Sequence, residues 1–101
     1  MGGLIIDLAL RSVAAEGRLL SLMLREFQLL QFLMTHRCRV FTRESLLMQV
    51  WGSHYEGDER VVDATIKRVR SKLPAPCANL IETVRGIGYR FVSETPASSS
   101  Q

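Results

Sequence analysis

The sequence of 101 residues has few of the residues that build disulfide frameworks, metal centres or membrane spans. Its two cysteines, Cys38 and Cys77, allow one bridge at most, and they are expected to be reduced thiols because no secretory signal is present. No four ligands have the spacing of a structural zinc site, so no metal is predicted. No apolar run approaches the roughly 18 residues of a membrane span. These absences favour a cytoplasmic domain without membrane contact.

Hallmarks of catalysis are missing as well. The two histidines belong to no nucleophile motif. The stretch Gly86-Ile87-Gly88 is too short for a phosphate-binding loop, since Phe91 stands where a third glycine would be needed. We therefore expect no enzyme, no catalytic residue and no cofactor.

Lysine is scarce. The 13 cationic residues comprise 11 Arg and only two Lys, and the formal net charge is +3. Arginine carries a rigid fork of donors that suits phosphates and guanine edges. The codon usage of a GC-rich genome would produce the same excess, and composition alone favours that explanation. The placement of the cations is therefore more informative than their number.

What is present indicates one ordinary globular domain, with 47% hydrophobic and 23% charged residues. We expect the domain to cover residues 1–92 and a flexible tail to cover residues 93–101, which are polar. Residues 1–22 alternate short apolar runs with turn-like breaks, which predicts a meander of strands with a turn at Glu16-Gly17. Apolar residues at helical spacing predict a first helix over about residues 25–35.

The rest of the chain is predicted to form two more helices and a hairpin. The second helix is expected to begin after Thr42, as its N-cap, and to stop at Gly52. The third is expected to open at residues 58–60 and to end before Pro74, which begins a short stiff connector over residues 74–76. The β-prone runs 80–84 and 89–92 flank a glycine-containing turn, which predicts a β-hairpin.

The third predicted helix separates apolar from basic residues. Its buried stripe consists of Val62, Ile66, Val69 and Leu73. Residues 64–73 carry no acid and four cations, Lys67, Arg68, Arg70 and Lys72, so that this segment alone has a charge of +4. A solvated basic face is the plain explanation. Nucleic-acid binding is favoured by small residues on the exposed side (Val61, Ala64, Thr65) and by a hairpin flank that carries Thr83, Arg85 and Arg90.

Four segments of the sequence form an ordered set of motifs. They are residues 22–32, 40–52 (Val-Phe-Thr-Arg-Glu-x-Leu-Leu-x-x-Val-Trp-Gly), 60–63 (Arg-Val-Val-Asp) and 83–91 (Thr-Val-Arg-Gly-Ile-Gly-Tyr-Arg-Phe). This set resembles the winged-helix effector domain of the OmpR/PhoB family of response regulators over nearly the whole chain except the tail. The resemblance implies an α+β fold, a winged helix-turn-helix with an N-terminal four-stranded antiparallel sheet, three helices and a C-terminal β-hairpin wing. It also implies a bacterial two-component transcription regulator whose receiver domain, absent from this chain, would precede Met1.

The resemblance further implies which residues contact promoter DNA. The third helix would enter the major groove, with Ala64, Thr65 and Arg68 toward the bases and Arg60, Lys67 and Arg70 on the phosphates. The backbone would also be contacted by Arg43, Trp51, Thr83 and Tyr89, and Arg85 would extend from the wing toward the minor groove. In the loop before the third helix, RNA polymerase would be contacted by Gly52, Asp58 and Glu59. Head-to-tail dimers on direct repeats are implied as well.

Several of these roles have structural alternatives. Trp51 and Tyr89 could belong to the core, and Asp58 and Glu59 could serve only to cap the third helix. In place of a Thr-Pro-type cap, the first helix is preceded by Met23-Leu24-Arg25, which predicts weak capping at a cost of about 1 kcal/mol. The whole domain could instead be a winged-helix module that contacts RNA polymerase or another regulator without specific DNA reading.

Overall fold

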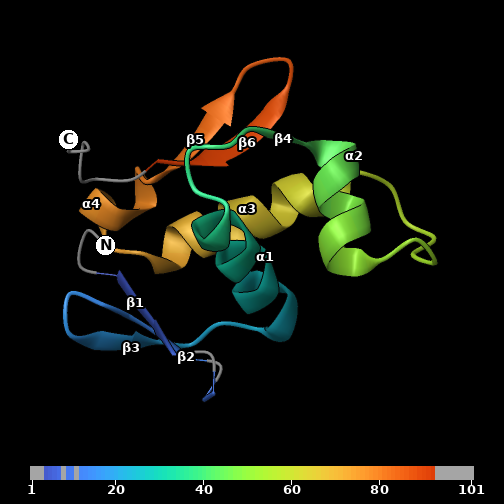
Figure 1. The fold of residues 1–101 in the computed structure, drawn as a ribbon. Helices are drawn as coiled ribbons and strands as arrows, with labels where there is room; N and C mark the ends of the chain where they lie inside the picture. Colours follow the sequence, from blue (N-terminus) through green and yellow to red (C-terminus); the bar gives the residue numbers. More distant parts are fainter. Residues whose placement is uncertain (1–3, 8, 11, 93–101) are drawn as a thin grey trace.

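A computed structural model of the chain describes residues 4–7, 9, 10 and 12–92. Two antiparallel sheets lie on opposite sides of a helical layer (Figure 1). The N-terminal sheet has the strand order β1-β2-β3, and the second sheet has the order β4-β6-β5. The elements in chain order are β1 (Leu4–Asp7), β2 (Ser12–Ala15), β3 (Arg18–Leu20), α1 (Leu24–Thr35), β4 (Phe41–Thr42), α2 (Arg43–Leu46), the π-helical turn η1 (Leu47–Trp51), α3 (Arg60–Lys72), α4 (Ala75–Ala78), β5 (Ile81–Val84) and β6 (Gly88–Phe91).

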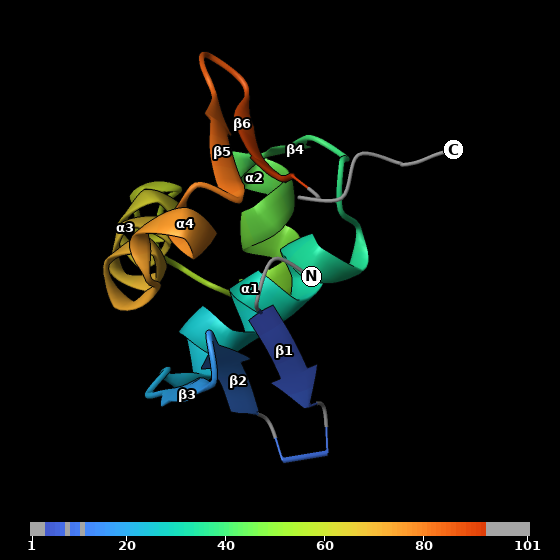
Figure 2. The same cartoon turned by 90° about the vertical axis from the view of Figure 1, so that its left-hand side faces the viewer.

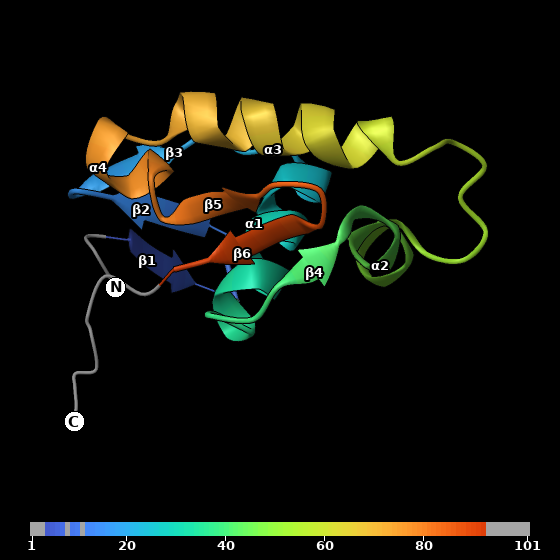
Figure 3. The ribbon, with the colours of Figure 1, turned by 90° about the horizontal axis from the view of Figure 1, so that it is seen from above.

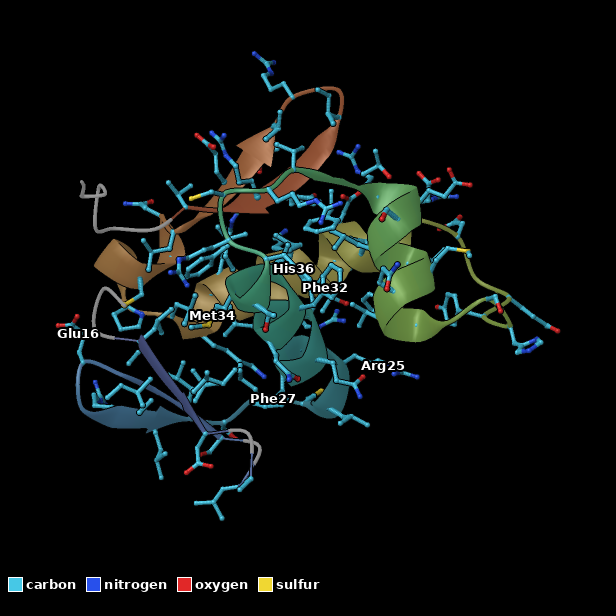
Figure 4. All side chains as sticks on the ribbon, in the orientation of Figure 1. Glu16, Arg25, Phe27, Phe32, Met34 and His36 are labelled. Atoms are coloured by element: carbon cyan, nitrogen blue, oxygen red, sulfur yellow. The ribbon has the colours of Figure 1, made fainter. Side chains whose placement is uncertain are left out.

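Helix α1 occupies the centre of the molecule, as its apolar sequence predicts. Leu29, Leu30 and Leu33 are fully buried, and the helix that carries them lies between the two sheets (Figure 1). At the end of α1 the rings of Phe32 and His36 lie side by side, with centroids 4.6 Å apart (Figure 4). Phe41 of β4 packs edge-on against Phe32 at 4.8 Å. This aromatic cluster attaches the second sheet to α1.

The N-terminal sheet has three strands among the described residues, and the expectation of four is wrong for this part of the chain. Only residues 21–23 separate β3 from α1, which leaves no length for a further strand between them. The turn predicted at Glu16-Gly17 joins β2 to β3, and both residues have positive φ, 54° and 82°. The tail predicted over residues 93–101 lies outside the described residues.

The predicted helix boundaries are close to the observed ones. The Thr42 hydroxyl caps α2 by accepting the N–H of Ser45 at 3.0 Å. The turn η1 ends at Gly52, whose φ of 98° suits glycine. The connector expected at residues 74–76 is different, because Ala75–Ala78 form the helical turn α4 directly after Pro74. Pro76 lies in the first turn of α4. A proline is tolerated there because the first N–H groups of a helix have no partner within the helix.

The hairpin of β5 and β6, residues 81–91, is called the wing below. Its turn includes Gly86 at φ 76°. Gly88 begins β6 opposite Thr42 of β4, where a Cβ would lie 1.9 Å from the carbonyl oxygen of Phe41. Because that oxygen belongs to the backbone, it cannot move aside as a flexible side chain would. The absence of a side chain at Gly88 therefore allows β4 to pair with the wing (Figure 3).

We predict that Gly88→Ala lowers the free energy of unfolding by about 3 kcal/mol, because the methyl group forces β4 and β6 apart. Gly86→Ala is the matched control. It places a side chain at positive φ with no neighbour within 4 Å, and it should cost only about 1 kcal/mol. Chemical denaturation of both variants checks the difference, and equal losses would contradict the close approach at Gly88.

Candidate nucleic-acid interface

Helix α3 lies along one side of the molecule with the wing beside it (Figure 2). Its buried stripe is as predicted, since Val62, Ile66 and Val69 are at most 1% exposed. The opposite side is open to solvent along the exposed residues Arg60, Ala64, Lys67 and Ser71, which are called the ridge below. None of the described elements covers this outer side of α3 (Figure 3). The ridge is therefore the part of the helix that can approach a ligand.

One flank of α3 is attached to α1 by the buried carboxylate of Glu26. The residue is 1% exposed. Its Oε1 accepts the Lys72 ammonium at 2.7 Å and the backbone N–H of Met23 at 2.9 Å, and its Oε2 accepts Nε of Arg68 at 3.3 Å. Burial acts to raise the pKa of Glu26, and the hydrogen bonds from Lys72, Met23 and Arg68 outweigh it and hold the pKa below its ordinary value. The carboxylate is thus charged and fully partnered at neutral pH.

Glu26 is a functional candidate that the residue pattern did not single out. It lies in the first turn of α1, where exposed acids are common, so its place in the helix does not by itself indicate burial. Its bond to Met23 N–H also supplies part of the missing N-terminal cap, which makes the predicted weak capping less severe. A signal was present in its neighbourhood, since an acid that interrupts the apolar face of a core helix needs cations from another element.

Arg68, predicted to face the bases, lies on this flank with 53% of its side chain exposed. Its Nη2 is 3.4 Å from the hydroxyl oxygen of Thr65. Thr65 itself is fully buried and donates its hydroxyl hydrogen to the carbonyl oxygen of Val61 at 2.7 Å. The expectation that Thr65 faces the bases is therefore wrong for this structure, because neighbouring elements cover a wider part of α3 than its four-residue stripe indicates.

The other flank of α3 is attached to α2 and the wing through Asp63. Its Oδ1 accepts Nε of Arg43 at 2.7 Å and also the hydroxyl of Tyr89. Burial acts to raise the pKa of Asp63, and the bonds from Tyr89 and Arg43 outweigh it and lower the pKa. Burial, together with Asp63, raises the pKa of Tyr89. Tyr89 is 5% exposed, so it is a core residue whose hydroxyl connects two elements.

Arg70 extends this attachment along the wing. Its guanidinium donates to the carbonyl oxygen of Ile81 at 2.7 and 3.2 Å and to the Thr83 hydroxyl at 2.8 Å, and it lies 5.7 Å from the centre of the Tyr89 ring. The structure thus brings together Arg43, Arg70, Thr83 and Tyr89, four of the predicted site residues. In the free protein they orient the wing against α3.

The remaining predicted DNA contacts differ in their exposure. Arg85 is exposed in the turn of the wing. Arg60 is also exposed, at 89% of its side chain, and is paired with Asp58 at 3.1 Å. Asp58 also accepts the N–H of Arg60, so it contributes to the start of α3, and this bond lowers its pKa. Trp51 is half-buried against the core, with its ring 6.3 Å from that of Tyr55.

The loop after Gly52 forms one wall of an open groove against α2 and η1. The groove is lined by Glu44, Leu47, Met48, Gly57, Asp58, Glu59 and Arg60. Met48 is 54% exposed in it. A lining that combines apolar side chains with charged ones, three of them acidic, is suited to contact with a protein.

The described part of the chain also bears on metal binding and membrane insertion. No three His, Cys, Asp or Glu side chains are grouped there to hold a metal ion. Among the same residues, no helix is long and apolar enough to cross a membrane.

Helices α2 and α3 with the adjoining hairpin define a winged helix-turn-helix domain, the architecture of a large class of DNA-binding proteins. A family profile described as "Transcriptional regulatory protein, C terminal" matches residues 17–91. The chain belongs to this family, as an effector domain of the OmpR/PhoB type of response regulator.

Three similar proteins illustrate the relationship. The phosphate regulon transcriptional regulatory protein PhoB of Pseudomonas aeruginosa is 43% identical over 95 residues, which cover 94% of this chain and 42% of PhoB. The response regulator DrrB of Thermotoga maritima has a TM-score of 0.82 and 36% identity, over 92% of this chain and 43% of DrrB. The RstA DNA-binding domain of Klebsiella pneumoniae, solved in complex with the RstA box, has a TM-score of 0.78 and 38% identity, over 90% of this chain and 92% of that domain. The chain thus spans less than half the length of PhoB and DrrB.

We predict that Glu26→Gln lowers the free energy of unfolding at neutral pH by about 2–3 kcal/mol, because two cations lose their buried counter-charge. The folded-state pKa of Glu26 is depressed, so its contribution is present above the unfolded value of about 4.3 and is lost as pH falls through the folded value. The gap between wild type and variant should therefore narrow below about pH 4. Denaturation series at several pH values measure it. Glu56→Gln, in the exposed loop, is the control, and a gap that stays constant down to pH 3 would contradict the prediction.

Proposed function

We propose that this chain binds double-stranded promoter DNA in a sequence-specific way, as the effector domain of a two-component transcription regulator. The observation that carries the proposal is the open ridge of α3, with Lys67 at its centre and Ala64 beside it, next to a wing held in fixed orientation. A helix of this kind fits the major groove, and a small residue such as Ala64 permits close approach to base edges. The complex of the RstA domain with its DNA box supports the same assignment.

The residues of the interface are proposed to have four roles. Ala64 and Arg68 face the bases. Lys67 and Arg60 contact phosphates, and Arg43, Arg70, Trp51, Thr83 and Tyr89 contact the backbone or hold the elements that do. Arg85, at the exposed turn of the wing, extends toward the minor groove.

Two partners are proposed beyond the DNA site. RNA polymerase is proposed to bind at Gly52, Asp58 and Glu59, beside the groove. The acidic residues of the groove lining and the exposed Met48 support this contact. A receiver domain in the same polypeptide and head-to-tail pairing on direct repeats follow from the family and from the length of PhoB. The second candidate function is contact with the polymerase or another regulator without sequence reading, which this groove would also serve.

Selection of bound duplexes from a random pool tests the proposal directly, because it returns both the binding and the preferred half-site. Sequence-specific binding that weakens steeply between low and moderate salt supports it. A chain that recovers no enriched sequence, and binds no duplex at low salt, would leave the protein-interaction module as the function.

We expect Lys67→Ala to weaken binding to all duplexes alike and to reduce the slope of log affinity against log salt by about one. Lys67 has no ion-pair partner among the described residues, so the substitution removes a phosphate contact without freeing an acid. Arg37→Ala is the control, since Arg37 is exposed in the loop between α1 and β4, on the side away from α3 (Figure 3). An unchanged salt slope in Lys67→Ala would remove this residue from the interface.

Arg68→Ala is expected to reduce discrimination at one base-pair position, by about 1–3 kcal/mol. The reason is that a guanidinium with free donors reads a base edge, whereas a phosphate contact carries no sequence information. Affinities for the selected duplex and for its single-base-pair variants, at one salt concentration, measure the effect. A parallel loss on every duplex would instead make Arg68 a phosphate contact.

A further inference from the structure

The buried Glu26 carboxylate is not part of the proposed DNA surface, yet it bonds a residue that is. A buried charge is strongly destabilising unless it is paired, and both cations that pair with Glu26 come from α3. Lys72 bonds Oε1 and Arg68 bonds Oε2. Each carboxylate oxygen of Glu26 thus has its own cation: Lys72 at the end of α3, and Arg68 one turn earlier, beside the ridge.

The contacts of Arg68 leave one edge of its guanidinium available. Its Nε–H is donated to Glu26, and one hydrogen of Nη2 is donated to Thr65. Nη1 and the second hydrogen of Nη2 have no partner among the described residues, and the side chain is 53% exposed. Two neighbouring terminal N–H groups are what a bidentate bond to guanine O6 and N7 requires.

Holding an arginine in place before it meets a base reduces the side-chain entropy lost on binding. An arginine that is free to rotate loses much of its rotamer entropy when it is immobilised. Glu26 can restrain Arg68 firmly because Glu26 is itself immobile, buried in the core helix and fixed by Met23 and Lys72. Thr65 is equally immobile, since it is fully buried.

The geometry points to Glu26 as a positioning residue for sequence reading: through its bond to Nε, it presents the terminal edge of Arg68 to one base pair of the bound DNA. This inference rests on the proposed function and deepens it. Base preference at one position would depend on Glu26, although Glu26 itself does not contact DNA. Guanine is the base whose edge fits the two free donors.

The test measures discrimination rather than affinity alone. The probes are the duplex selected by the wild-type chain and the same duplex with each base pair exchanged in turn, at one salt concentration. Glu26→Gln should reduce discrimination at the base pair read by Arg68 about tenfold and leave the other positions unchanged. Combined with Arg68→Ala it should add nothing at that position, because both substitutions remove the same interaction.

Lys72→Met is the matched control. It removes the other partner of Glu26, and with it a comparable buried ion pair, but it leaves the bond to Arg68 in place. It should therefore destabilise the fold while base discrimination is retained. If Glu26→Gln does not fold, Glu26→Asp keeps the charge but shortens the side chain by one methylene, and it should lose discrimination at the same base pair.

The outcomes separate this inference from the proposed function. If Arg68→Ala loses discrimination while Glu26→Gln and Glu26→Asp keep it, Glu26 is only structural and the inference is overturned while DNA reading stands. Equal loss of discrimination in Lys72→Met would likewise assign the effect to general loosening of α3. If the wild-type chain prefers no duplex, the proposed function fails and the inference fails with it.

Discussion

The placement of α3 depends on one buried charge, the carboxylate of Glu26 in the core helix. An ionised group at this depth persists only if donors reach it, and the donors here are the N-terminus of α1 and two cations of α3. Those bonds can form in only one rotation of α3 about its axis. The apolar stripe of α3 tolerates small rotations because hydrophobic contact is not directional. The bonds to the Glu26 carboxylate therefore fix the rotation of α3 about its axis more precisely than the apolar core does. This rotation determines which residues form the ridge.

Asp63 has the corresponding role on the opposite flank. It joins Arg43 of α2 and Tyr89 of β6, while Arg70 joins α3 to β5 by three hydrogen bonds. The third strand of this sheet, β4, pairs with β6 only at Phe41 and Thr42, so the bonds to α3 add support to a hairpin that would be marginally stable alone. The helix and the wing are thus joined through Asp63 and Arg70, while Glu26 joins the helix to α1. Rigidity of this kind favours sequence reading, which requires groups placed within fractions of an ångström.

Periodicity and capping signals predicted α1, α2, α3 and the hairpin closely, because each of these patterns is local. Thr42 as a cap and the stripe beginning at Val62 are examples. The features that these local patterns do not predict depend on tertiary contacts. Thr65 is buried because neighbouring elements cover that side of α3, and its hydroxyl bond to Val61 within its own helix allows a polar residue to lie there. Glu26 was overlooked because its partners lie more than 40 positions away in the sequence.

Most of the cations of α3 already have partners within the domain. Residues 64–73 carry four cations, but Arg68 and Lys72 bond Glu26, and Arg70 bonds the wing. Only Lys67 among these four has no partner in the described residues. In the proposed complex with DNA, a count of cations would therefore overestimate the number of phosphate contacts, because a cation already paired with a carboxylate has less charge to offer a phosphate. Much of the basic character of α3 serves its attachment to the rest of the domain, and the ridge retains the part available to DNA.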